Sequence, residues 1–486
     1  MKNQVQLITY VDRLGCKNIK ELKDLLQNQL QDFFGGVHIL PFYYPIDGED
    51  AGFDPIDHEQ IDPRLGDWDD LKSLSEDIDI MADLIVNHVS AKSTIFQDYL
   101  QKGKDSDYAS MFLSFESVFP NGASEGDILS IYRPRPSLPF TRFDFADDSS
   151  KLIWTTFTSN QIDIDVNSKK GNQYLENILK AFQKGGVKMI RLDAAGYAIK
   201  KKGTSCFMIE ETYEFIDQLA EKAKAKGIAV LVEIHSYYKT QIEIAKRVDY
   251  VYDFALPVLV LDTLFNKKAS SLKKWLAVSP RNAITVLDTH DGIGIVDVAS
   301  EDGKEGLIED NVLNNIVEKI HLNSKGDSLK ATGAAASNLD LYQVNCTYFD
   351  ALGRDETAYL IARTIQFFVP GIPQVYYVGV FAGENDMDLL AKTNVGRDIN
   401  RRYFTKDEID AHLKRPLINA LKELMIFRNV HPAFNGTFNL VDTPDSLLNI
   451  KWENGQDSAE LMIDLANTKM DVHFTEYGEM RSLAMV

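Results

Sequence analysis

Eight short runs of apolar residues are spread along the chain, and amphipathic helical patterns separate several of them. Continuous apolar runs are typical of parallel strands that are covered on both faces. The runs lie at residues 4–10, 36–42, 80–88, 187–194, 229–235, 250–256, 283–291 and 373–379. Because strand and helix patterns alternate, the sequence predicts an α/β protein with a (β/α)₈ TIM barrel.

Two of the helical patterns carry end signals. The first begins where Asn18 and Glu21 are placed as a capping box, in which each side chain binds the backbone of the other residue. The second ends at Gly185-Gly186, a pair suited to closing a helix. We therefore expect helices between the first two strands and before the fourth strand.

Two long gaps and one change of pattern interrupt the alternation. We expect one inserted subdomain after the third strand and another after the seventh, because structureless loops of that length are uncommon. Short alternating runs such as SLLNIKW then predict a small C-terminal β domain. The expected division is barrel 1–88, subdomain 89–170, barrel 171–291, subdomain 292–350, barrel 351–435 and β domain 436–486.

Length and charge narrow the class of protein. The 486 residues fit a barrel of about 250 residues that insertions and an appended domain enlarge. Lys and Arg number 52 against 72 Asp and Glu, which gives a formal net charge of −20. So acidic a chain repels nucleic acid and anionic membranes, and we expect neither as a partner. Any anion that it binds needs a local cluster of Arg.

The N-terminus and the cysteines indicate the compartment. The first residues, MKNQVQLITYVDRLG, contain no apolar segment of a secretory signal, and no stretch of the chain is long enough to span a bilayer. Cys16, Cys206 and Cys346 show no CxxC spacing, which favours reduced and mostly buried thiols over disulfides or a metal site. We expect a cytoplasmic protein, with the oligomeric state open between a monomer and a homodimer.

Three acidic residues each end an apolar run: Asp193 in MIRLDAAGY, Glu233 in VLVEIHS and Asp291 in TVLDTHDG. The C-terminal ends of barrel strands open on the active-site face, so these carboxylates are expected to meet a substrate there. Taken singly, each could equally be a helix N-cap or a solvated ion pair. Three together, two of them flanked by His or Arg, favour glycoside chemistry, which commonly uses a pair of carboxylates.

Several segments identify a family. DLIVNH (83–88), IRLDAAG (190–196), LVEIH (231–235) and LDTHDG (287–292) resemble the four signature segments of the α-amylase family of retaining glycoside enzymes, and QIDID and GIPQVYY are similar to two further segments. IYRPRPSLPF, AASNLDLYQVN and GRDINR resemble the branch of that family that contains sucrose-cleaving phosphorylases. The resemblance covers most of the chain up to about residue 435. It implies retaining transfer of glucosyl from sucrose to phosphate, giving α-D-glucose 1-phosphate and D-fructose.

The resemblance implies a role for each carboxylate. Asp193 would be the nucleophile, Glu233 the general acid/base and Asp291 the residue that stabilises the transition state. Arg191 lies two positions before Asp193 on a strand, so both side chains share one face, and we expect its charge to hold Asp193 ionised. Glu233 is expected to lie in a poorly solvated site that keeps a proton for the leaving fructose.

The same resemblance implies the groups that bind glucose. Asp50, His88, His290 and Arg397 match positions that hold glucosyl hydroxyls, Phe53 and Phe157 match apolar walls, and Gln161 lies in the similar QIDID segment. From the residues alone, Asp50 could instead cap a turn, His88 could be a hydrogen-bonded core histidine, and the two phenylalanines could belong to the core.

Candidate partners of the other substrates follow from the same segments. Arg135 in RPRP, Tyr342 in LDLYQ and His235 just past Glu233 are candidates to bind phosphate, for which the forked guanidinium is well suited. Asp340 and Gln343 look like the partners of the fructosyl group. Composition alone would instead place Arg135 in a solvated surface loop.

This chain also departs from the wider family. Thr289 stands where Asn is common, and Gly196-Tyr197 stands where many relatives that bind longer glucans or calcium carry Lys-His. No acidic calcium loop is present in the sequence, so we expect no cofactor and no metal. The expected partners are small molecules: sucrose, phosphate, glucose 1-phosphate and fructose.

Three alternative functions stay open. A sister phosphorylase would use fructose 6-phosphate, glycerol or glycerate as acceptor, but an extra phosphate calls for a second basic cluster, and ASNLDLYQVN contains no Lys or Arg. The second alternative is a glucosidase that hydrolyses sucrose. The third is a catalytically silent sugar-binding barrel, which would not need Asp193, Glu233 and Asp291 together.

Overall fold

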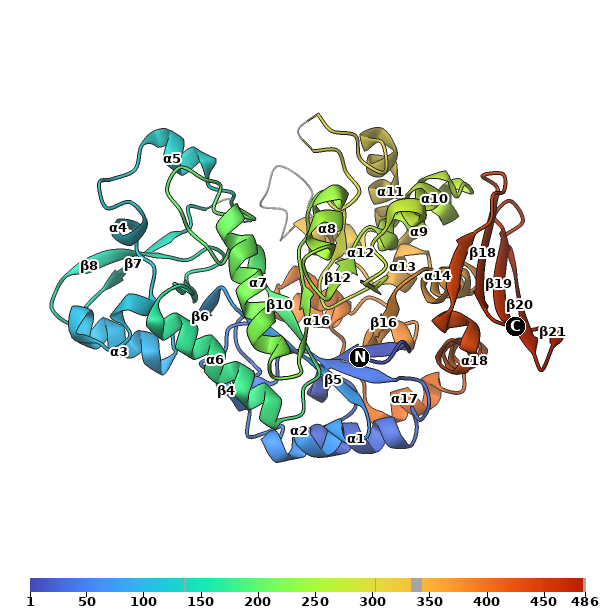
Figure 1. Cartoon of the computed structure of the whole chain (residues 1–486), viewed down its shortest axis with the longest axis horizontal. Coiled ribbons are helices and arrows are strands. Elements are labelled where there is room, and N and C mark those ends of the chain that lie inside the picture. Colours follow the sequence, from blue (N-terminus) through green and yellow to red (C-terminus); the bar gives the residue numbers. More distant parts are fainter. Residues whose placement is uncertain (135–136, 302, 334–342, 484–486) are drawn as a thin grey trace.

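The computed structural model describes residues 1–134, 137–301, 303–333 and 343–483 (Figure 1). Its centre is a closed barrel of eight parallel strands, which confirms the predicted TIM barrel. Around the barrel the strands follow one another as β1 (Gln6–Thr9), β16 (Ile372–Tyr376), β13 (Ala283–Thr285), β12 (Tyr250–Asp253), β11 (Ala229–Val232), β10 (Met189–Asp193), β5 (Asp79–Ile85) and β2 (Gly36–Ile39). Each lies in or beside one of the eight predicted apolar runs.

The barrel strands are buried on both faces, which explains their apolar composition. A few charged residues break this rule, among them a pair on neighbouring strands. Asp83 on β5 and Arg191 on β10 are paired in the strand register and are both buried inside the barrel. The two side chains form an ion pair inside the barrel.

Helices occupy the connections between the strands. They are α1 (Ile19–Gln27), α2 (Trp68–Ser75), α6 (Lys169–Lys184), α7 (Glu210–Lys224), α8 (Tyr238–Ala245), α9 (Leu256–Asn266), α10 (Ser270–Val278) and α14 (Glu356–Phe368), and after β16 come α15 (Tyr377–Val380), α16 (Met387–Thr393), α17 (Lys406–His412) and α18 (Pro416–Val430). Single 3₁₀ turns are η1 (Val11–Arg13), η4 (Ala195–Tyr197), η5 (Gly396–Asn400) and η6 (Pro432–Asn435).

Both predicted helix ends are found, one of them only in part. The Asn18 side chain accepts from the Glu21 backbone N–H at 3.0 Å, but the Glu21 carboxylate accepts from Lys17 and not from Asn18. The expected capping box is therefore wrong in its second half, because Glu21 reaches one residue further back along the chain. Helix α6 ends at Gly185, and Gly186 turns the chain with φ +77°.

The excursion after β5 forms the left end of the molecule (Figure 1). It contains β6 (His88–Ser90), α3 (Thr94–Lys102), η2 (Gly103–Asp105), η3 (Ala109–Met111), α4 (Phe115–Val118), α5 (Glu125–Ser130), β7 (Phe140–Asp144), β8 (Ser150–Trp154) and β9 (Gln161–Asp163). Strands β6 and β9 pair antiparallel, so the excursion leaves and re-enters the barrel side by side.

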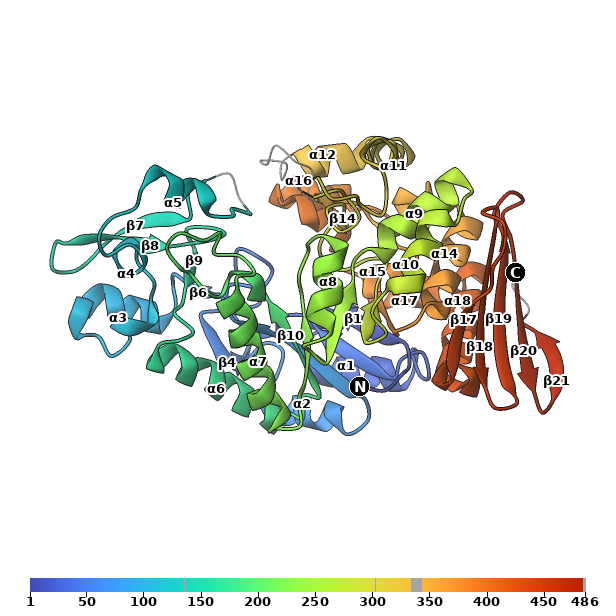
Figure 2. The ribbon, with the colours of Figure 1, turned by 45° about the horizontal axis from the view of Figure 1, so that its top comes forward.

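A second excursion follows β13, and its helices α11 and α12 lie at the top of the molecule (Figure 2). It contains β14 (Ile293–Gly294), α11 (Asp310–Asn323), α12 (Asp327–Gly333), β15 (Gln343–Val344) and α13 (Tyr348–Ala351). A short antiparallel ladder of β14 and β15 also joins two parts of this excursion, with Gly294 opposite Gln343. A smaller pair, β3 (Tyr43–Tyr44) and β4 (Asp57–Ile61), follows β2.

The C-terminal residues form a five-stranded antiparallel sheet at the right end of the molecule (Figure 1). Its strands are β17 (Thr437–Leu440), β18 (Leu447–Asn454), β19 (Asp457–Asp464), β20 (Lys469–Glu476) and β21 (Glu479–Ser482). Trp452 joins this sheet to the barrel, because its indole N–H donates to the Phe368 carbonyl at 2.7 Å. The predicted small β domain is confirmed, whereas the exact residue limits of all the domains stay predictions.

Among the described residues, no helix is long and apolar enough to cross a membrane. Cys16, Cys206 and Cys346 are buried free thiols, as the sequence predicts.

Candidate active site

The three predicted carboxylates line one pocket of about 480 Å³ at the C-terminal ends of the barrel strands. Asp193 is the last residue of β10, Glu233 follows β11, and Asp291 lies in the loop between β13 and β14. Their side chains keep 14%, 13% and 10% of their surface exposed. Each carboxylate is therefore largely desolvated but still open to a molecule in the pocket.

One guanidinium binds two of these carboxylates. Arg191 Nη1 lies 3.0 Å from Asp193 Oδ1, and its Nη2 lies 2.7 Å from Glu233 Oε1. The same Nη1 is also 2.5 Å from Asp83 Oδ1. Because Arg191 is only 2% exposed, its positive charge acts on these acids with little screening by water.

The charge of Arg191 is therefore divided among three acids, and the direction of the pKa shift of Asp193 contradicts the expectation that Arg191 holds it ionised. Burial raises the pKa of Asp193 well above its usual range. Arg191 acts to lower this pKa, but the nearby Glu233 carboxylate raises it further. Asp193 and Glu233 thus share one buried cation at the ends of two adjacent strands.

Asp291 has the opposite environment. Arg397 Nη1 lies 2.9 Å from Asp291 Oδ1, Arg401 Nη2 lies 3.9 Å from it, and His290 Nε2 lies 3.6 Å from Oδ2. Although burial alone would raise the pKa of Asp291, the guanidinium groups of Arg397 and Arg401 hold it far below its usual range. Asp291 therefore provides a permanent negative charge. Sequence reasoning missed Arg401, although it lies in the same GRDINR segment as Arg397.

The residues expected to bind glucose form what we call the first wall. All of them line the pocket: Asp50, Phe53, His88, Phe157, Gln161, His290 and Arg397. The ladder of β6 and β9 brings His88 and Gln161 together, with His88 Nε2 at 3.1 Å from Gln161 Nε2 and 3.0 Å from the Phe53 carbonyl oxygen. The Phe53 ring stacks on His290 with a centroid distance of 4.8 Å.

The environment of the two histidines of the first wall favours the neutral imidazole. Burial lowers the pKa of His88, and burial lowers the pKa of His290 well below its usual range with the help of Arg191 and Arg401. His88 is thus both a pocket residue and a hydrogen-bonded core histidine, so the two interpretations of its sequence context coexist. Neutral imidazoles suit hydroxyl groups, because each can donate and accept a hydrogen bond.

A buried lysine supports the first wall from behind. Lys200 Nζ lies 2.8 Å from Asp163 Oδ2, donates to Asn87 Oδ1 at 2.9 Å and also donates to the Tyr197 carbonyl. Asp163 pairs with His88 in the β6–β9 ladder. Both charged side chains are almost completely buried. Lys200 carries no sequence signal, because its partners come from three separate segments.

Three aromatic residues that sequence reasoning did not single out also line the pocket: Tyr132, Tyr197 and Phe207. Tyr132 and Phe207 stack with centroids 4.6 Å apart, and Tyr197 lies 4.8 Å from Phe207. Tyr132 lies in IYRPRPSLPF, a segment that indicated the family branch without indicating this side chain.

The second wall consists of His235, Gln343 and Asn345, which line the pocket beyond Glu233. His235 Nε2 lies 4.0 Å from Glu233 Oε1 and 3.4 Å from Gln343 Nε2, while its ring stacks on Phe254 at 3.8 Å. Burial alone would lower the pKa of His235, but Asp297 and Glu233 raise it above its usual value. Of the other predicted acceptor residues, Arg135, Asp340 and Tyr342 lie outside the described residues.

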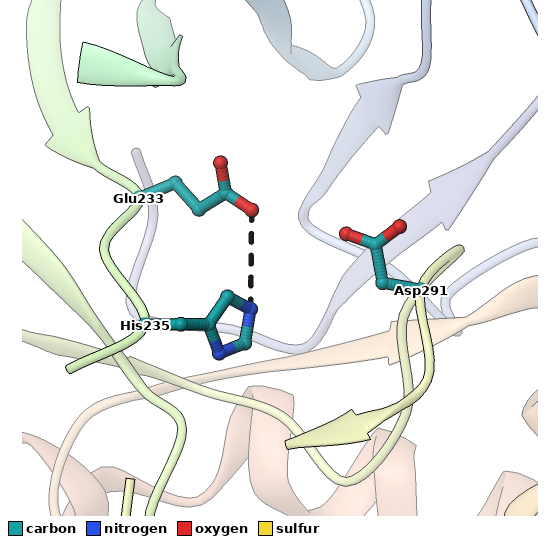
Figure 3. Close-up of side chains that lie close together, drawn as sticks. All are labelled: Glu233, His235 and Asp291. Atoms are coloured by element: carbon teal, nitrogen blue, oxygen red, sulfur yellow. Dashed lines mark ion pairs between the residues drawn. The ribbon is translucent and has the colours of Figure 1, made fainter. Parts of the chain in front are cut away.

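Glu233, His235 and Asp291 bring ligand atoms within 4.8 Å of one another, which is close enough to hold a metal ion (Figure 3). Figure 3 shows the Glu233 carboxylate facing the His235 ring, with Asp291 across from both. The charges nearby argue against a cation here, because Arg191 already binds Glu233 and Arg397 already binds Asp291. The arrangement suits acid–base and nucleophilic chemistry better than metal binding.

Comparison with known proteins agrees with this geometry. The family model described as Alpha amylase, catalytic domain, matches residues 30–320. The chain is 59% identical over 473 residues to sucrose phosphorylase of Agrobacterium vitis, with 97% of each chain covered. It is 52% identical to sucrose phosphorylase of Bifidobacterium adolescentis, covering 96% of this chain and 92% of that protein.

Among solved structures, the crystal structure of sucrose 6F-phosphate phosphorylase from Thermoanaerobacter thermosaccharolyticum matches with a TM-score of 0.91 and 40% identity. The match covers 99% of this chain and 98% of that chain.

Proposed function

The chain belongs to the α-amylase family, and we propose that it acts as a sucrose phosphorylase. It transfers glucosyl from sucrose to phosphate with retention, giving α-D-glucose 1-phosphate and D-fructose. The observation that carries the proposal is the shared guanidinium of Arg191, which holds Asp193 and Glu233 at the ends of two adjacent strands. With permanently charged Asp291 beside them, these residues make up the groups that a double displacement needs.

In the first step, an oxygen of Asp193 attacks the anomeric carbon of the glucosyl group. The bond from that carbon to the fructosyl oxygen breaks while Glu233 donates its proton to that oxygen, so fructose leaves neutral. Asp291 faces the positive charge that develops on the ring, and its low pKa keeps it ionised. The product is a glucosyl ester of Asp193.

In the second step, a phosphate oxygen attacks the same carbon from the side that fructose left. Asp193 is released as a carboxylate, and Glu233 takes up the proton of the incoming phosphate. Two inversions leave the configuration unchanged. The first wall, with its neutral histidines and its apolar ring faces, holds the glucosyl group through both steps.

The choice of phosphate over water needs its own support. Water can attack the same ester, and directing the ester a hundredfold toward phosphate takes about 2.7 kcal/mol of differential stabilisation. His235, with its raised pKa beside Glu233, supplies a cationic donor at this place. Arg135 and Tyr342 are proposed as further donors on the basis of the sequence resemblance.

The main alternative is a sister phosphorylase acting on sucrose 6′-phosphate or glucosylglycerol. The sucrose phosphorylases of Agrobacterium vitis and Bifidobacterium adolescentis are 59% and 52% identical to this chain, whereas the sucrose 6F-phosphate phosphorylase of known structure is 40% identical. The segment ASNLDLYQVN, which carries the proposed fructosyl partners Asp340 and Gln343, also contains no Lys or Arg for a second phosphate. Both facts favour unphosphorylated fructose. A glucosidase that hydrolyses sucrose is the other alternative.

A cytoplasmic location and a homodimer are further proposals. The location is supported by three buried free thiols, which are typical of a reducing compartment. Light scattering of the pure protein distinguishes the homodimer from a monomer by a factor of two in mass.

The proposed function is tested by incubating the pure protein with sucrose, with and without phosphate, and identifying the products by chromatography. We expect glucose 1-phosphate and fructose in equal amounts when phosphate is present. Free glucose in place of glucose 1-phosphate would indicate the glucosidase. Activity only with sucrose 6′-phosphate or glucosylglycerol would indicate the sister enzyme.

A further inference from the structure

Asp297 is a completely buried carboxylate next to the pocket, and the mechanism above does not use it. It accepts three hydrogen bonds: from His235 Nδ1 at 2.9 Å, from the Ser236 backbone N–H at 3.2 Å and from Gln241 Nε2 at 2.8 Å. All three donors belong to the segment that follows Glu233. Asp297 therefore fixes the chain beyond the proposed acid/base to the loop after β14.

Gly294 leaves room for this contact. A Cβ atom at Gly294 would lie 2.4 Å from Asp297 Oδ2, closer than real Cβ atoms come to other atoms, and 3.1 Å from His235 Nδ1, which is also tight. Gly294 is not among the residues with left-handed backbone, so the glycine is needed here for space and not for its conformation. The same residue pairs with Gln343 in the β14–β15 ladder. The β14–β15 ladder thus leaves space at Gly294 for the Asp297–His235 bond and places Gln343 in the second wall.

The bond determines which way His235 faces. Because Nδ1 is held by Asp297 and the ring lies flat on Phe254, Nε2 points toward Glu233 and Gln343. Among the described residues, the acids Asp297, Glu233 and Asp291 act on His235, and all three favour the protonated ring. A protonated Nε2 can be met by the oxygen of the Gln343 amide, whose two ends interchange by a half-turn.

We propose that Asp297 is a positioning residue that holds His235 as an imidazolium facing the second wall, and that this charge favours phosphate over water as acceptor of the glucosyl group. The inference rests on the proposed function. It assigns to Asp297 a part in acceptor choice and none in forming the glucosyl ester.

The charge balance of the pocket explains why such a device is needed. The chain carries a net charge of −20, and six acidic residues line the pocket, so an incoming phosphate is repelled unless a fixed cation receives it. Arg191 and Arg397 are already bound to carboxylates. An imidazolium attracts phosphate, which is an anion, but it does not attract water, which is neutral. Its charge therefore favours phosphate over water as the acceptor.

The test is Asp297→Asn, which keeps the size of the side chain and removes its charge. We expect kcat/KM for phosphate to fall at least about tenfold, while hydrolysis of sucrose without phosphate changes less than about twofold. Loss of the Asp297 charge lowers the pKa of His235, so the imidazolium disappears at a lower pH. The alkaline limb of the phosphate profile should therefore move to lower pH, and titration of the His235 ring by NMR should show the same shift.

Asp350→Asn is the matched control. Asp350 is also buried and accepts three hydrogen bonds, from Thr347 Oγ1, Arg354 Nε and the Asn385 backbone N–H, but it does not line the pocket. We expect this variant to lose stability without a change in the ratio of phosphorolysis to hydrolysis. Gly294→Ala is a second test, because it leaves every charge in place and pushes Asp297 away from His235. Like Asp297→Asn, Gly294→Ala should lower the ratio of phosphorolysis to hydrolysis.

Equal losses of phosphorolysis and hydrolysis in Asp297→Asn and in Gly294→Ala would overturn the inference. An unchanged titration of His235 in Asp297→Asn would overturn it as well. The NMR titration does not depend on turnover, so it separates this inference from the proposed function. If the wild-type protein formed no glucose 1-phosphate, the proposed function would fail, and with it the inferred role in acceptor choice, whatever the titration showed.

Discussion

The environments of His88 and His290 in the first wall favour the neutral imidazole, whereas His235 in the second wall is held toward the protonated form. All three rings are buried, so burial does not account for the difference. The difference lies in the acids: at His235 the hydrogen-bonded Asp297 and the nearby Glu233 outweigh the effect of burial on the pKa, whereas at His88 and His290 the effect of burial prevails although acids lie nearby. The first wall thus suits a neutral sugar and the second an anion.

The two walls also differ in how the chain builds them. The first wall comes mainly from strand ends, from the β6–β9 ladder and from η5, and buried ion pairs hold it on several sides. The second wall depends on the excursion after β13, which supplies Gln343 and, through Asp297, the orientation of His235. In this account the barrel determines the chemistry and the excursion determines the acceptor. The predictions below separate these two parts.

The largest effect is expected from Asp193→Ala. Without the nucleophile no glucosyl ester forms, so turnover of sucrose should fall by about 10⁴-fold or more with and without phosphate. The fold should persist, because Arg191 still has Asp83 and Glu233 as partners. Steady-state kinetics and a thermal melt measure the two properties. Near-normal turnover would show that Asp193 is not the nucleophile. The division of roles between the two walls would then have no basis.

Glu233→Gln should distinguish leaving groups. Fructose leaves only with a proton, so we expect a loss of about 10²–10⁴-fold with sucrose as glucosyl donor. Glucosyl fluoride needs no proton to release its leaving group, and its use should be affected far less. The comparison is made from the rate of the first step with each donor. Equal losses with both donors would show that Glu233 is not the proton donor.

Lys200→Met tests the support of the first wall. Removing the ammonium leaves Asp163 buried and uncompensated, which should lower the free energy of unfolding by about 3–5 kcal/mol. Because Asp163 pairs with His88, KM for sucrose should rise as well. Denaturant unfolding and kinetics measure the two changes.

The control for that variant is Lys246→Met, which breaks the exposed pair with Glu243 and should cost less than about 1 kcal/mol. A similar loss of stability in both variants would show that the buried cation has no special part in the wall.

The smallest effect concerns the acceptor in the reverse direction. With glucose 1-phosphate as donor, we expect kcat/KM for fructose to exceed that for fructose 6-phosphate at least about tenfold, since an unmatched buried polar contact costs ~1–3 kcal/mol. The segment ASNLDLYQVN, which carries the proposed fructosyl partners, contains no Lys or Arg that could bind a second phosphate. A ratio near one, or one favouring the phosphorylated sugar, would assign the sister activity and leave the first wall unaffected.

The sequence predicted much of the barrel because buried parallel strands leave continuous apolar runs, and all eight runs mark strands. It also pointed to Asp193, Glu233 and Asp291, which end such runs and line one pocket. It could not predict that Arg191 is shared, since this depends on the register that places Asp83 of β5 beside Arg191 of β10. Asp297 gave no signal either, because its partner His235 lies in a distant segment.

The central claim is that glucosyl passes from sucrose to phosphate through an ester on Asp193. The most direct test is NMR of the first product formed from sucrose and phosphate, before any slow change of configuration. The account predicts α-glucose 1-phosphate alone, because the first wall holds one sugar through two inversions. Formation of the β anomer would contradict it, since a single displacement would then have occurred and Asp193 could not have carried the sugar.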